Sequence, residues 1–403
     1  MTLPEDDHRS EPVSYEPVSV KDVLVEMKDT SELLIDLAYS AVLHNSDAIA
    51  EEVLRLEKQM DVLELRARMS IMLAARNPDD TEVLAPVLGV VGGAEKISDA
   101  AGDVAKIVLE DMGLPEAMRA ALPEAFEPLE RTTLVDDSAY AGRTLGDIDL
   151  ESETGVRVIG IRRGEDWFLN PGPDTKLLAD DVVLIRGPEH AIGDVYESVA
   201  EEEYESVAAP EPAIDDLDRA VDSIVHMKNL SELAVDVAYG SVLFDDAALA
   251  EEVRNLEVEV DALQSRFEAW TLGAAADAED PVALRGLIRL GIATETISDA
   301  ALEISEGILR DIDVHPVVEL AVRESDEVLT RIEVEEGSEL AGEQLTEGVP
   351  TVGPSATVIA IRRPEVGWVL VGQAQEVLQP GDVLIAKGTR TAAESFRELA
   401  SAS

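Results

Sequence analysis

The chain has 403 residues, and its 85 acidic and 32 basic side chains give a formal net charge of −53. This excess of carboxylates excludes a nucleic-acid binder that matches phosphates through an overall basic surface. Cysteine is absent, which excludes disulfides, thiolate metal sites and cysteine nucleophiles. With 46% hydrophobic residues, the chain has enough apolar material for about two to four domains, each with its own core.

The charge also indicates the setting in which the protein folds. Like charges repel over a Debye length of about 8 Å at physiological salt but only about 3 Å near 1 M, so a very salty, halophilic cytoplasm is the simplest setting. The first 20 residues contain no apolar run typical of a signal sequence. The uncharged apolar stretch Val83 to Ala94 is much shorter than the about 20 residues that span a bilayer. We therefore expect a soluble, cytoplasmic protein.

The chain repeats itself with an offset of 200 residues. Residues 27–63 and 227–263 are identical at 19 of 37 positions without a gap, and Ile97–Ala101 recurs as Ile297–Ala301. One inserted residue then shifts Trp167 to Trp368. A repeat of this length is too long for a solenoid unit, so each copy should contain domains of its own.

In chain order, a disordered acidic tail at residues 1–19 precedes a predicted helical bundle at 20–122. Val53, Leu56, Met60 and Leu63 recur at spacings of three and four, which is typical of an amphipathic helix, and Pro78 follows that segment. From Arg131 onward, short β-rich pieces separated by Gly, Pro and Asp predict a small α/β domain at 126–199. After an acidic linker at 200–216, the second copy gives a bundle at 217–322 and an α/β domain at 326–400.

Each predicted helix carries a Glu and an Asp four residues apart, which places both carboxylates on one helix face. Such a face can hold a hard cation through oxygen ligands, such as a divalent or iron ion. Because acidic residues are so frequent here, four-spaced pairs also arise by chance, and a solvated or bundle-positioning role is the alternative. The candidate metal ligands are Glu32, Asp36, Glu57, Asp61, Glu95, Asp99, Glu232, Asp236, Glu257, Asp261, Glu295 and Asp299.

These acidic pairs, with Tyr39 and Tyr239 in the first helices and the run Glu95-x-Ile-Ser-Asp-Ala-Ala in the third, resemble the PhoU family of three-helix bundles. The resemblance covers roughly residues 20 to 120 and 217 to 320. It implies metal clusters bound on the Glu/Asp-x-x-x-Asp motifs.

The α/β part contains several linked motifs in a fixed order: Ser138-x-x-x-Gly142, the strand Val156–Arg163, Pro171–Thr175 and Asp181–Gly187. The second copy repeats them with Ser338, Gly342, Thr357–Arg363 and Pro380–Ile385. Their order and spacing resemble the TrkA C-terminal (RCK_C) domain, the ligand-sensing part of potassium-conductance regulators. The first copy departs from the pattern with Asp180-Asp181 in place of Gly-Asp, and the second with Gln373–Glu376 in place of the Pro-Asp-Thr turn.

The whole chain is similar to a haloarchaeal-type potassium transport regulator with both domains duplicated. The expected fold class is α+β multidomain, with two PhoU-like three-helix bundles alternating with two small α/β domains. A nucleotide-binding Rossmann domain usually accompanies the TrkA C-terminal domain, but no G-x-G-x-x-G turn follows a strand here. NAD or ATP binding by that route is not expected. The glycines 89, 92 and 93 lie in a helical pattern and predict close helix packing.

Arginines crowd into one strand of each α/β domain, where guanidinium groups suit phosphates or pair with nearby carboxylates. The resemblance implies that these domains pair and bind a small anionic ligand, such as a cyclic dinucleotide, between two copies. We expect an intramolecular pair with one cleft flanked by the two arginine-bearing strands. The candidate ligand-binding residues are Ile159, Ile161, Arg162, Arg163, Ile359, Ile361, Arg362 and Arg363.

Catalysis is not expected, because the five histidines fall at unmatched positions in the two copies and no predicted helix carries the Glu-x-x-His motif that a di-iron bundle has on two helices. The sequence therefore predicts a regulatory subunit, peripheral to a membrane transporter, that controls potassium or other monovalent-cation transport by binding. The expected partners are a membrane cation channel or transporter and a small anionic ligand, with a second copy of the chain as a further option and no nucleic acid. The alternatives are a PhoU-like phosphate-signalling scaffold and a carboxylate-bridged metalloenzyme.

Overall fold

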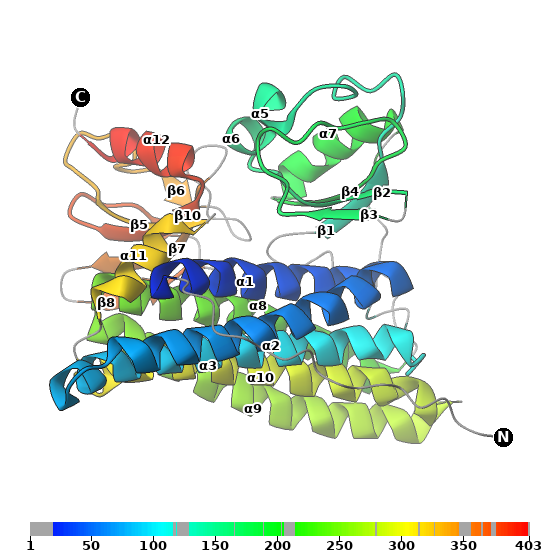
Figure 1. Ribbon diagram of the computed structural model, residues 1–403. Helices are drawn as coiled ribbons and strands as arrows, with labels where there is room; N and C mark the ends of the chain where they lie inside the picture. Colours follow the sequence, from blue (N-terminus) through cyan, green and yellow to red (C-terminus); the bar gives the residue numbers. More distant parts are fainter. Residues whose placement is uncertain are drawn as a thin grey trace.

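A layer of long helices carries two small sheet domains side by side on one of its faces (Figure 1). The predicted fold class is confirmed, because helical bundles and sheet domains alternate along the chain and each occurs twice. The computed structural model describes residues 19–115, 118, 129–164, 166–187, 189–202, 204, 214–278, 280–312, 315–325, 327–345, 356–363, 366–371 and 376–401.

Helices of the first bundle begin at residues that cap a helix N-terminus. The side chain of Ser46 accepts a hydrogen bond from the backbone N–H of Ile49, and that of Asn77 accepts one from Asp80, with Pro78 in the first turn. The second bundle has the same plan, with Asp246 as the N-cap of its middle helix. The helices are α1 (Val20–His44), α2 (Asp47–Ala74), α3 (Pro78–Leu109), α8 (Asp215–Phe244), α9 (Ala247–Asp277), the 3₁₀ helix η2 (Pro281–Leu284) and α10 (Arg285–Leu309).

The two bundles share one hydrophobic core through the contact of α3 with α10. A Cβ atom added at Gly93 would lie 2.4 Å from the side chain of Ile304, and one at Gly307 would lie 2.5 Å from Pro86. The backbone N–H of Gly286 donates to the carbonyl of Gly113 at 3.0 Å. Glycine is therefore required where these helices touch, which confirms the close packing predicted for the glycines of α3.

Each sheet domain is a four-stranded antiparallel sheet with a helix after its last strand. The strand orders are β1-β4-β2-β3 and β5-β10-β7-β8, so the two copies have the same topology. The first domain contains β1 (Leu129–Thr133), α5 (Leu145–Ile148), α6 (Leu150–Thr154), β2 (Arg157–Arg163), β3 (Asp166–Leu169), β4 (Val182–Arg186) and α7 (Glu189–Ala200). The second contains β5 (Val328–Glu333), β6 (Gln344–Leu345), β7 (Ala356–Arg363), β8 (Gly367–Leu370), β9 (Glu376–Val377), β10 (Val383–Gly388) and α12 (Arg390–Ala400), and α11 (Pro316–Glu324) precedes it.

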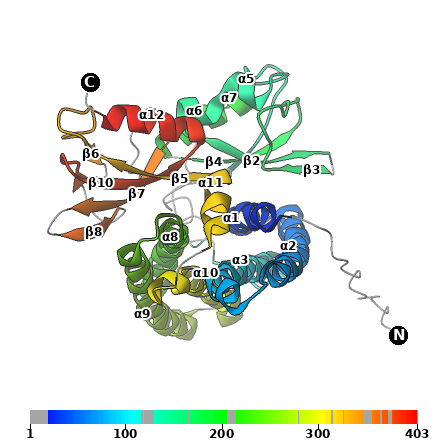
Figure 2. The ribbon, with the colours of Figure 1, turned by 60° about the vertical axis from the view of Figure 1, so that its left-hand side comes forward.

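The two faces of each sheet belong to different cores. One face packs under the helix of its own domain, α7 or α12, and the other rests on the helical layer, as Figure 2 shows. In the first sheet Val158 and Ile161 lie in the core beneath α7, whereas Ile159 and Leu184 belong to the core of the bundles. A sheet domain therefore cannot move relative to its bundle without disturbing a shared apolar contact.

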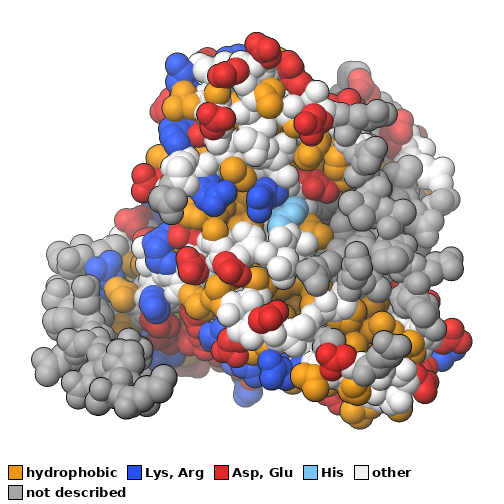
Figure 3. Space-filling model, turned by 90° about the vertical axis from the view of Figure 1, so that its right-hand side faces the viewer, with side chains coloured by type: hydrophobic (Ala, Val, Ile, Leu, Met, Phe, Trp, Pro, Cys, Tyr) orange, Lys and Arg blue, Asp and Glu red, His pale blue; other side chains and the backbone are white. Residues whose placement is uncertain are grey.

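The predicted tail falls almost wholly outside the described residues, as does the middle of the predicted linker, 205–213. Helix α8 begins at Asp215, inside the range predicted as linker. None of the helices in the described part of the chain combines the length and hydropathy needed to cross a bilayer. Acidic side chains are spread over the face shown in Figure 3, with basic and hydrophobic side chains between them.

Candidate functional site

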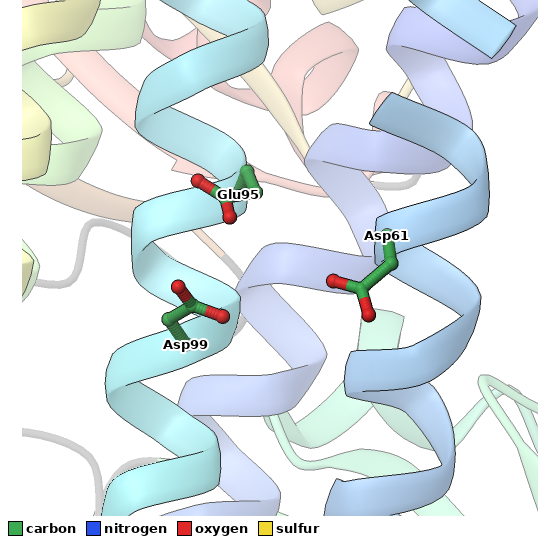
Figure 4. A group of neighbouring side chains, drawn as sticks. All are labelled: Asp61, Glu95 and Asp99. Atoms are coloured by element: carbon green, nitrogen blue, oxygen red, sulfur yellow. The ribbon is translucent and has the colours of Figure 1, made fainter. Parts of the chain in front are cut away.

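Two helices of the first bundle bring three of the predicted metal ligands together. Asp61 on α2 faces Glu95 and Asp99 on α3, and one carboxylate oxygen of each lies within 4.8 Å of the others (Figure 4). The four-residue spacing on α3 puts its two carboxylates on one face, and the packing of α2 against α3 supplies the third. Oxygen atoms grouped in this way are the donor set that a hard cation requires.

The electrostatics of this triad also fit a cation. Partial burial, followed by the charges of Asp99, Glu64 and Asp61, raises the pKa of Glu95 to about 7. Burial and the charge of Asp61 likewise raise the pKa of Asp99. The negative charges therefore oppose one another, and a bound cation would relieve that repulsion. The chemistry of these residues fits the metal that the PhoU resemblance implies.

The pairs on α9 and α10 repeat this arrangement less tightly. Burial and the charges of Asp299, Asp261 and Glu257 raise the pKa of Glu295. Within the described residues, however, only the triad of the first bundle meets the 4.8 Å distance. In that bundle Glu57 has its own counter-charge, since the Lys106 ammonium lies 3.6 Å from it.

The pairs on α1 and α8 have other partners. The Lys28 ammonium donates to Glu32 at 2.8 Å, and Lys228 donates to Glu232 at the same distance. The second carboxylate of each pair contacts a strand of a sheet domain, as described next. These contacts favour ion pairing over metal binding for Glu32, Asp36, Glu232 and Asp236, and metal binding by them stays a prediction.

A buried ion network joins the helical layer to both sheets. Arg186, the last residue of β4, donates to Asp36 of α1 at 2.8 Å. At the equivalent position Lys387 of β10 donates to Asp236 of α8 at 2.9 Å. Each of the four side chains is at most 16% exposed, so these are buried ion pairs that fix each sheet on its bundle.

Glu327 lies at the centre of this network. It is the residue before β5, and one of its oxygens lies 3.0 Å from the ammonium of Lys387. Its other oxygen lies 3.6 Å from Arg157 and 3.9 Å from Arg186, both in the first sheet. One carboxylate thus connects the two sheet domains, which lie next to each other.

The pKa values follow from this arrangement. Burial alone would raise the pKa of Glu327, but the charges of Lys387, Arg186 and Arg157 hold it well below its usual range. For Asp36 and Asp236 the nearby cations do not outweigh the effect of burial on the pKa. Burial raises the pKa of each to about 6 in spite of Arg186 or Lys387, because Glu232 or Glu32 and Glu327 also lie nearby. The cations of the junction therefore do not fully compensate the negative charge of its buried carboxylates.

Each bundle also places a lysine over a tyrosine of the other bundle. The Lys28 ammonium lies 5.3 Å from the ring centre of Tyr239, and Lys228 lies 5.0 Å from that of Tyr39. Both lysines are almost fully buried, so the cation–π contacts are formed away from water. They tie α1 and α8 together next to the ion network.

The strand arginines are divided between structural and exposed positions. Arg163 donates to the buried Asp181 at 2.8 and 2.7 Å, and Arg363 donates to the buried Asp382 at 3.2 and 3.3 Å. These pairs support the alternative that the arginines partner nearby carboxylates. Arg162 is half-buried, and Arg362 is exposed with its guanidinium 6.0 Å from the ring centre of Trp368. Ligand binding by these four arginines stays a prediction.

The expected cleft between the two arginine-bearing strands is wrong in its geometry. Ile161 and Ile361 are fully buried in two separate cores, each beneath the helix of its own domain, so they do not line one cleft. The reason is a β-bulge in each strand, where the pairing with the neighbouring strand skips Ile159 or Ile359. These two residues face the bundles, while Ile161 and Ile361 face away from them.

Sequence reasoning missed the residues that build the junction, namely Lys28, Arg157, Arg186, Lys228, Glu327 and Lys387. A signal was available for some of them. Lys28 recurs as Lys228, four residues before a retained Glu, and the last strand of each sheet carries a basic residue at the equivalent position, Arg186 or Lys387. In a chain with so few basic side chains, a basic residue retained in both copies indicates a specific carboxylate partner.

Family models match the same two domains twice along the chain. A model of the TrkA-C domain matches residues 129–200 and 329–401, which are the two sheet domains. A model of the PhoU domain matches residues 24–108 and 224–308, which are the two bundles. The chain carries two PhoU domains and two TrkA-C domains. The junction described above is therefore an interface between PhoU and TrkA-C domains.

Solved structures resemble the chain only weakly as wholes. The crystal structure of PhoU from Pseudomonas aeruginosa is 15% identical over 72% of this chain and 96% of that chain, with a TM-score of 0.40. The GsuK RCK domain is 13% identical over 80% of this chain and 78% of that chain, with a TM-score of 0.19. The GsuK channel bound to NAD is 12% identical over 77% and 65%, with a TM-score of 0.18. No curated protein matches the chain.

Proposed function

We propose that this protein is a cytoplasmic regulatory subunit that controls a membrane channel or transporter for potassium or another monovalent cation, and that it acts by binding rather than by catalysis. The observation that carries the proposal is the TrkA-C domain, matched twice in one chain and placed both times on a PhoU domain. TrkA-C domains are typical of ligand-sensing parts of potassium-conductance regulators.

The junction supplies a physical route for regulation. Each sheet shares an apolar core with its bundle and is held by a buried ion pair, and Glu327 connects the two sheets. A ligand that binds one arrangement of a sheet more tightly than another shifts the population of that arrangement. Because the contacts are buried and directional, the shift is transmitted to the PhoU bundles and hence to a bound membrane partner.

Two kinds of ligand suit the surfaces available. A small anion, such as a cyclic dinucleotide, would contact the Arg162 and Arg362 side chains of the TrkA-C domains. A hard cation would be held by Asp61, Glu95 and Asp99 on the first PhoU bundle, where it would neutralise crowded carboxylates. The two inputs act on different domains, and the junction between them would combine their effects.

A second candidate function is phosphate signalling, with the PhoU bundles as the sensing part. It is favoured by the PhoU match over both bundles and by the metal-competent triad of the first. The two functions differ in what the cell loses when the gene is removed. Transport regulation predicts altered cation uptake, whereas phosphate signalling predicts altered phosphate uptake.

The test is a deletion strain of the source organism in which rubidium uptake, as a tracer for potassium, and phosphate uptake are measured together. We expect rubidium uptake to change and to be restored by the wild-type gene and by Glu268→Gln, a control on the exposed side of α9. The Glu327→Gln variant, which weakens the connection between the sheets, should restore it poorly. Unchanged rubidium uptake with altered phosphate uptake would replace the first function by the second.

A further inference from the structure

A cavity of about 340 Å³ lies between the second TrkA-C sheet and the helices α1, α8 and α9. Its volume is within the range of small-molecule binding sites, about 300 to 1,000 Å³. Residues of β7, β8 and β10, together with Arg186 of β4, form its wall on the sheet side, and α8 forms much of the opposite wall. An occupant would therefore touch a PhoU domain and a TrkA-C domain at once.

Among the described residues, the space at the equivalent place in the first copy is far smaller. The equivalent site is lined by the equivalent residues of α1, β2 and β4, together with Glu327, but its volume is only about 10 Å³. Three of the lining positions differ between the copies. Arg157 is replaced by Thr357, Asn170 by Val371 and Arg186 by Lys387, so the second copy has shorter or less polar side chains. The large cavity therefore lies at the sheet of the second copy and not at the equivalent place on the first.

The cavity has an apolar body. Leu230 and Leu256 are almost fully buried on the helical side, and Ile359 and Val371 are buried on the sheet side. Leu370 of β8 completes this part of the lining. A ligand that fills this space gains affinity by removing apolar surface from water, so its body should be hydrocarbon rather than sugar or phosphate.

The charge of the lining is negative. Six carboxylates line the cavity, and four of them, Glu32, Asp36, Glu232 and Asp236, have a lysine or arginine partner of their own. The other two, Glu252 and Glu259 of α9, have no Lys or Arg within salt-bridge distance among the described residues. Glu252 accepts only from the Asn255 amide at 3.2 Å, and Glu259 lies 3.9 Å from His226. An anionic ligand would meet net repulsion here.

We propose that this cavity binds a small organic cation whose hydrocarbon body lies against the leucine and isoleucine side chains and whose charged amine faces Glu252 and Glu259. The site is separate from the strand arginines and takes a ligand of opposite charge. It also stands whether or not the protein regulates transport, because binding can be measured on the purified protein alone. Its position makes the occupied state a second control on the contact between the second sheet and its bundle.

Three probes with the same six-carbon chain separate charge from hydrophobicity: hexylamine, hexanol and hexanoate. Titration calorimetry of the full chain in constant high potassium chloride should show the tightest binding for hexylamine, weaker binding for hexanol and none for hexanoate. The double variant Glu252→Gln/Glu259→Gln should weaken hexylamine about tenfold and leave hexanol unchanged, since only the charged contact is lost. Glu268→Gln, on the same helix but away from the cavity, should leave all three unchanged.

A second variant tests the place of binding. Thr357→Arg puts the first copy's side chain into the second junction and should abolish binding of both hexylamine and hexanol. The reverse change, Arg157→Thr, should leave hexylamine binding at the original site intact. The glutamine variants change only side chains at the cavity mouth, so they decide the charge question even if Thr357→Arg fails to fold. Equal or tighter binding of hexanoate, no binding of hexylamine, or hexylamine binding insensitive to the double variant would each overturn the proposal.

Discussion

The two sheet–bundle junctions started as copies of one another and now differ in a specific way. Both keep a basic residue at the end of the last strand that pairs with an aspartate on the bundle, Arg186 with Asp36 and Lys387 with Asp236. The residues that fill the space around the pair have diverged, and only the second junction contains a large cavity. The buried charge was retained in both copies, while the packing around it was not.

The difference follows from the cost of each kind of change. Loss of one member of a buried ion pair leaves an uncompensated charge, whereas a shorter side chain at a junction leaves a space that water or a ligand can fill. Glu327 adds a further asymmetry. It contacts cations of both sheets, and its counterpart in the first copy, Glu127, lies outside the described residues.

The largest effect is expected at Glu327, since it faces three cations that are all largely buried. Glu327→Gln should lower the free energy of unfolding by about 3 to 5 kcal/mol, the range for breaking a buried ion pair. Urea unfolding in constant high salt measures this directly. Glu324→Gln, at an exposed position three residues earlier, is the control and should cost less than about 1 kcal/mol. Similar losses for both variants would show that Glu327 does not hold the junction.

The two acidic faces offer the next comparison. Addition of Mg²⁺ or Mn²⁺ should stabilise the wild type by about 2.7 kcal/mol at one hundred times the Kd. Glu95→Gln/Asp99→Asn should remove most of that gain, because the tight triad is lost. The equivalent change in the second bundle, Glu295→Gln/Asp299→Asn, should remove less. Thermal unfolding with and without metal gives the values, and equal losses in the two variants would mean that the faces are equivalent.

The paired aspartates should respond unequally to removal. Asp36→Asn removes the 2.8 Å contact of Arg186 and leaves the Glu327 carboxylate 3.9 Å from its guanidinium, whereas in Asp236→Asn the Lys387 ammonium keeps Glu327 at 3.0 Å. We expect a loss of about 2 to 3 kcal/mol for Asp36→Asn and about 1 kcal/mol less for Asp236→Asn, within the range for hydrogen bonds to charged groups. Equilibrium unfolding of both variants in the same buffer measures the difference. A larger loss of stability for Asp236→Asn than for Asp36→Asn would contradict this prediction.

The pH dependence of the junction follows from the same two residues. Burial raises the pKa of Asp36 and of Asp236 to about 6, above the ordinary value of 3.8 for an aspartate. The folded state therefore binds more protons between these values, and the stability that they contribute is present below pH 3.8 and lost as the pH rises through about 6. Relative to Asp36→Asn/Asp236→Asn, the wild type should lose about 2 kcal/mol for each of the two aspartates between pH 4.5 and pH 7. A constant difference across this range would contradict the raised pKa values.

Much of the architecture could be predicted because its signals are long and repeated. The constant offset between copies and the change from helical to strand periodicity predict four parts, and structure and family models agree on them. That Glu95 and Asp99 share one face follows from helix geometry, because they are i, i+4 residues, whereas Asp61 joins them only through the packing of α2 against α3. These inferences depend on local patterns, which a sequence records directly.

The junction could not be predicted, because it depends on single residues brought together from distant parts of the chain. Asp36 and Arg186 are 150 residues apart, and nothing in either segment indicates the other. The bulge at Ile159 is a one-residue change of register that reverses which side chains face the bundle, and no pattern in the strand reveals it. The cavity depends on whether Arg or Thr occupies one strand position, which matters only once that position is known to face a helix.

The smallest effect on stability is expected at two equivalent buried tyrosines, Tyr39 and Tyr239. The two copies differ there in one hydrogen bond of the tyrosine hydroxyl. The hydroxyl of Tyr39 shares a hydrogen bond of 2.8 Å with that of Thr294, on the third helix of the other bundle. The residue equivalent to Thr294 in the first copy is Ala94, and the hydroxyl of Tyr239 has no partner of normal geometry among the described residues. Ser31 lies near it, but its hydroxyl donates to the carbonyl of Lys28.

Tyr39→Phe should therefore cost about 1 kcal/mol, since it breaks a buried hydrogen bond and leaves the Thr294 hydroxyl with only the carbonyl of Leu290. Tyr239→Phe should be neutral or slightly stabilising, because it removes a buried hydroxyl that is not satisfied. Both variants keep the aromatic ring that the buried lysine of the other bundle contacts, so the difference between them isolates the hydroxyl. Urea unfolding of the two variants measures it. Equal losses would mean that the Tyr239 hydroxyl is satisfied in solution and that the bundles are more alike than their sequences at Ala94 and Thr294 indicate.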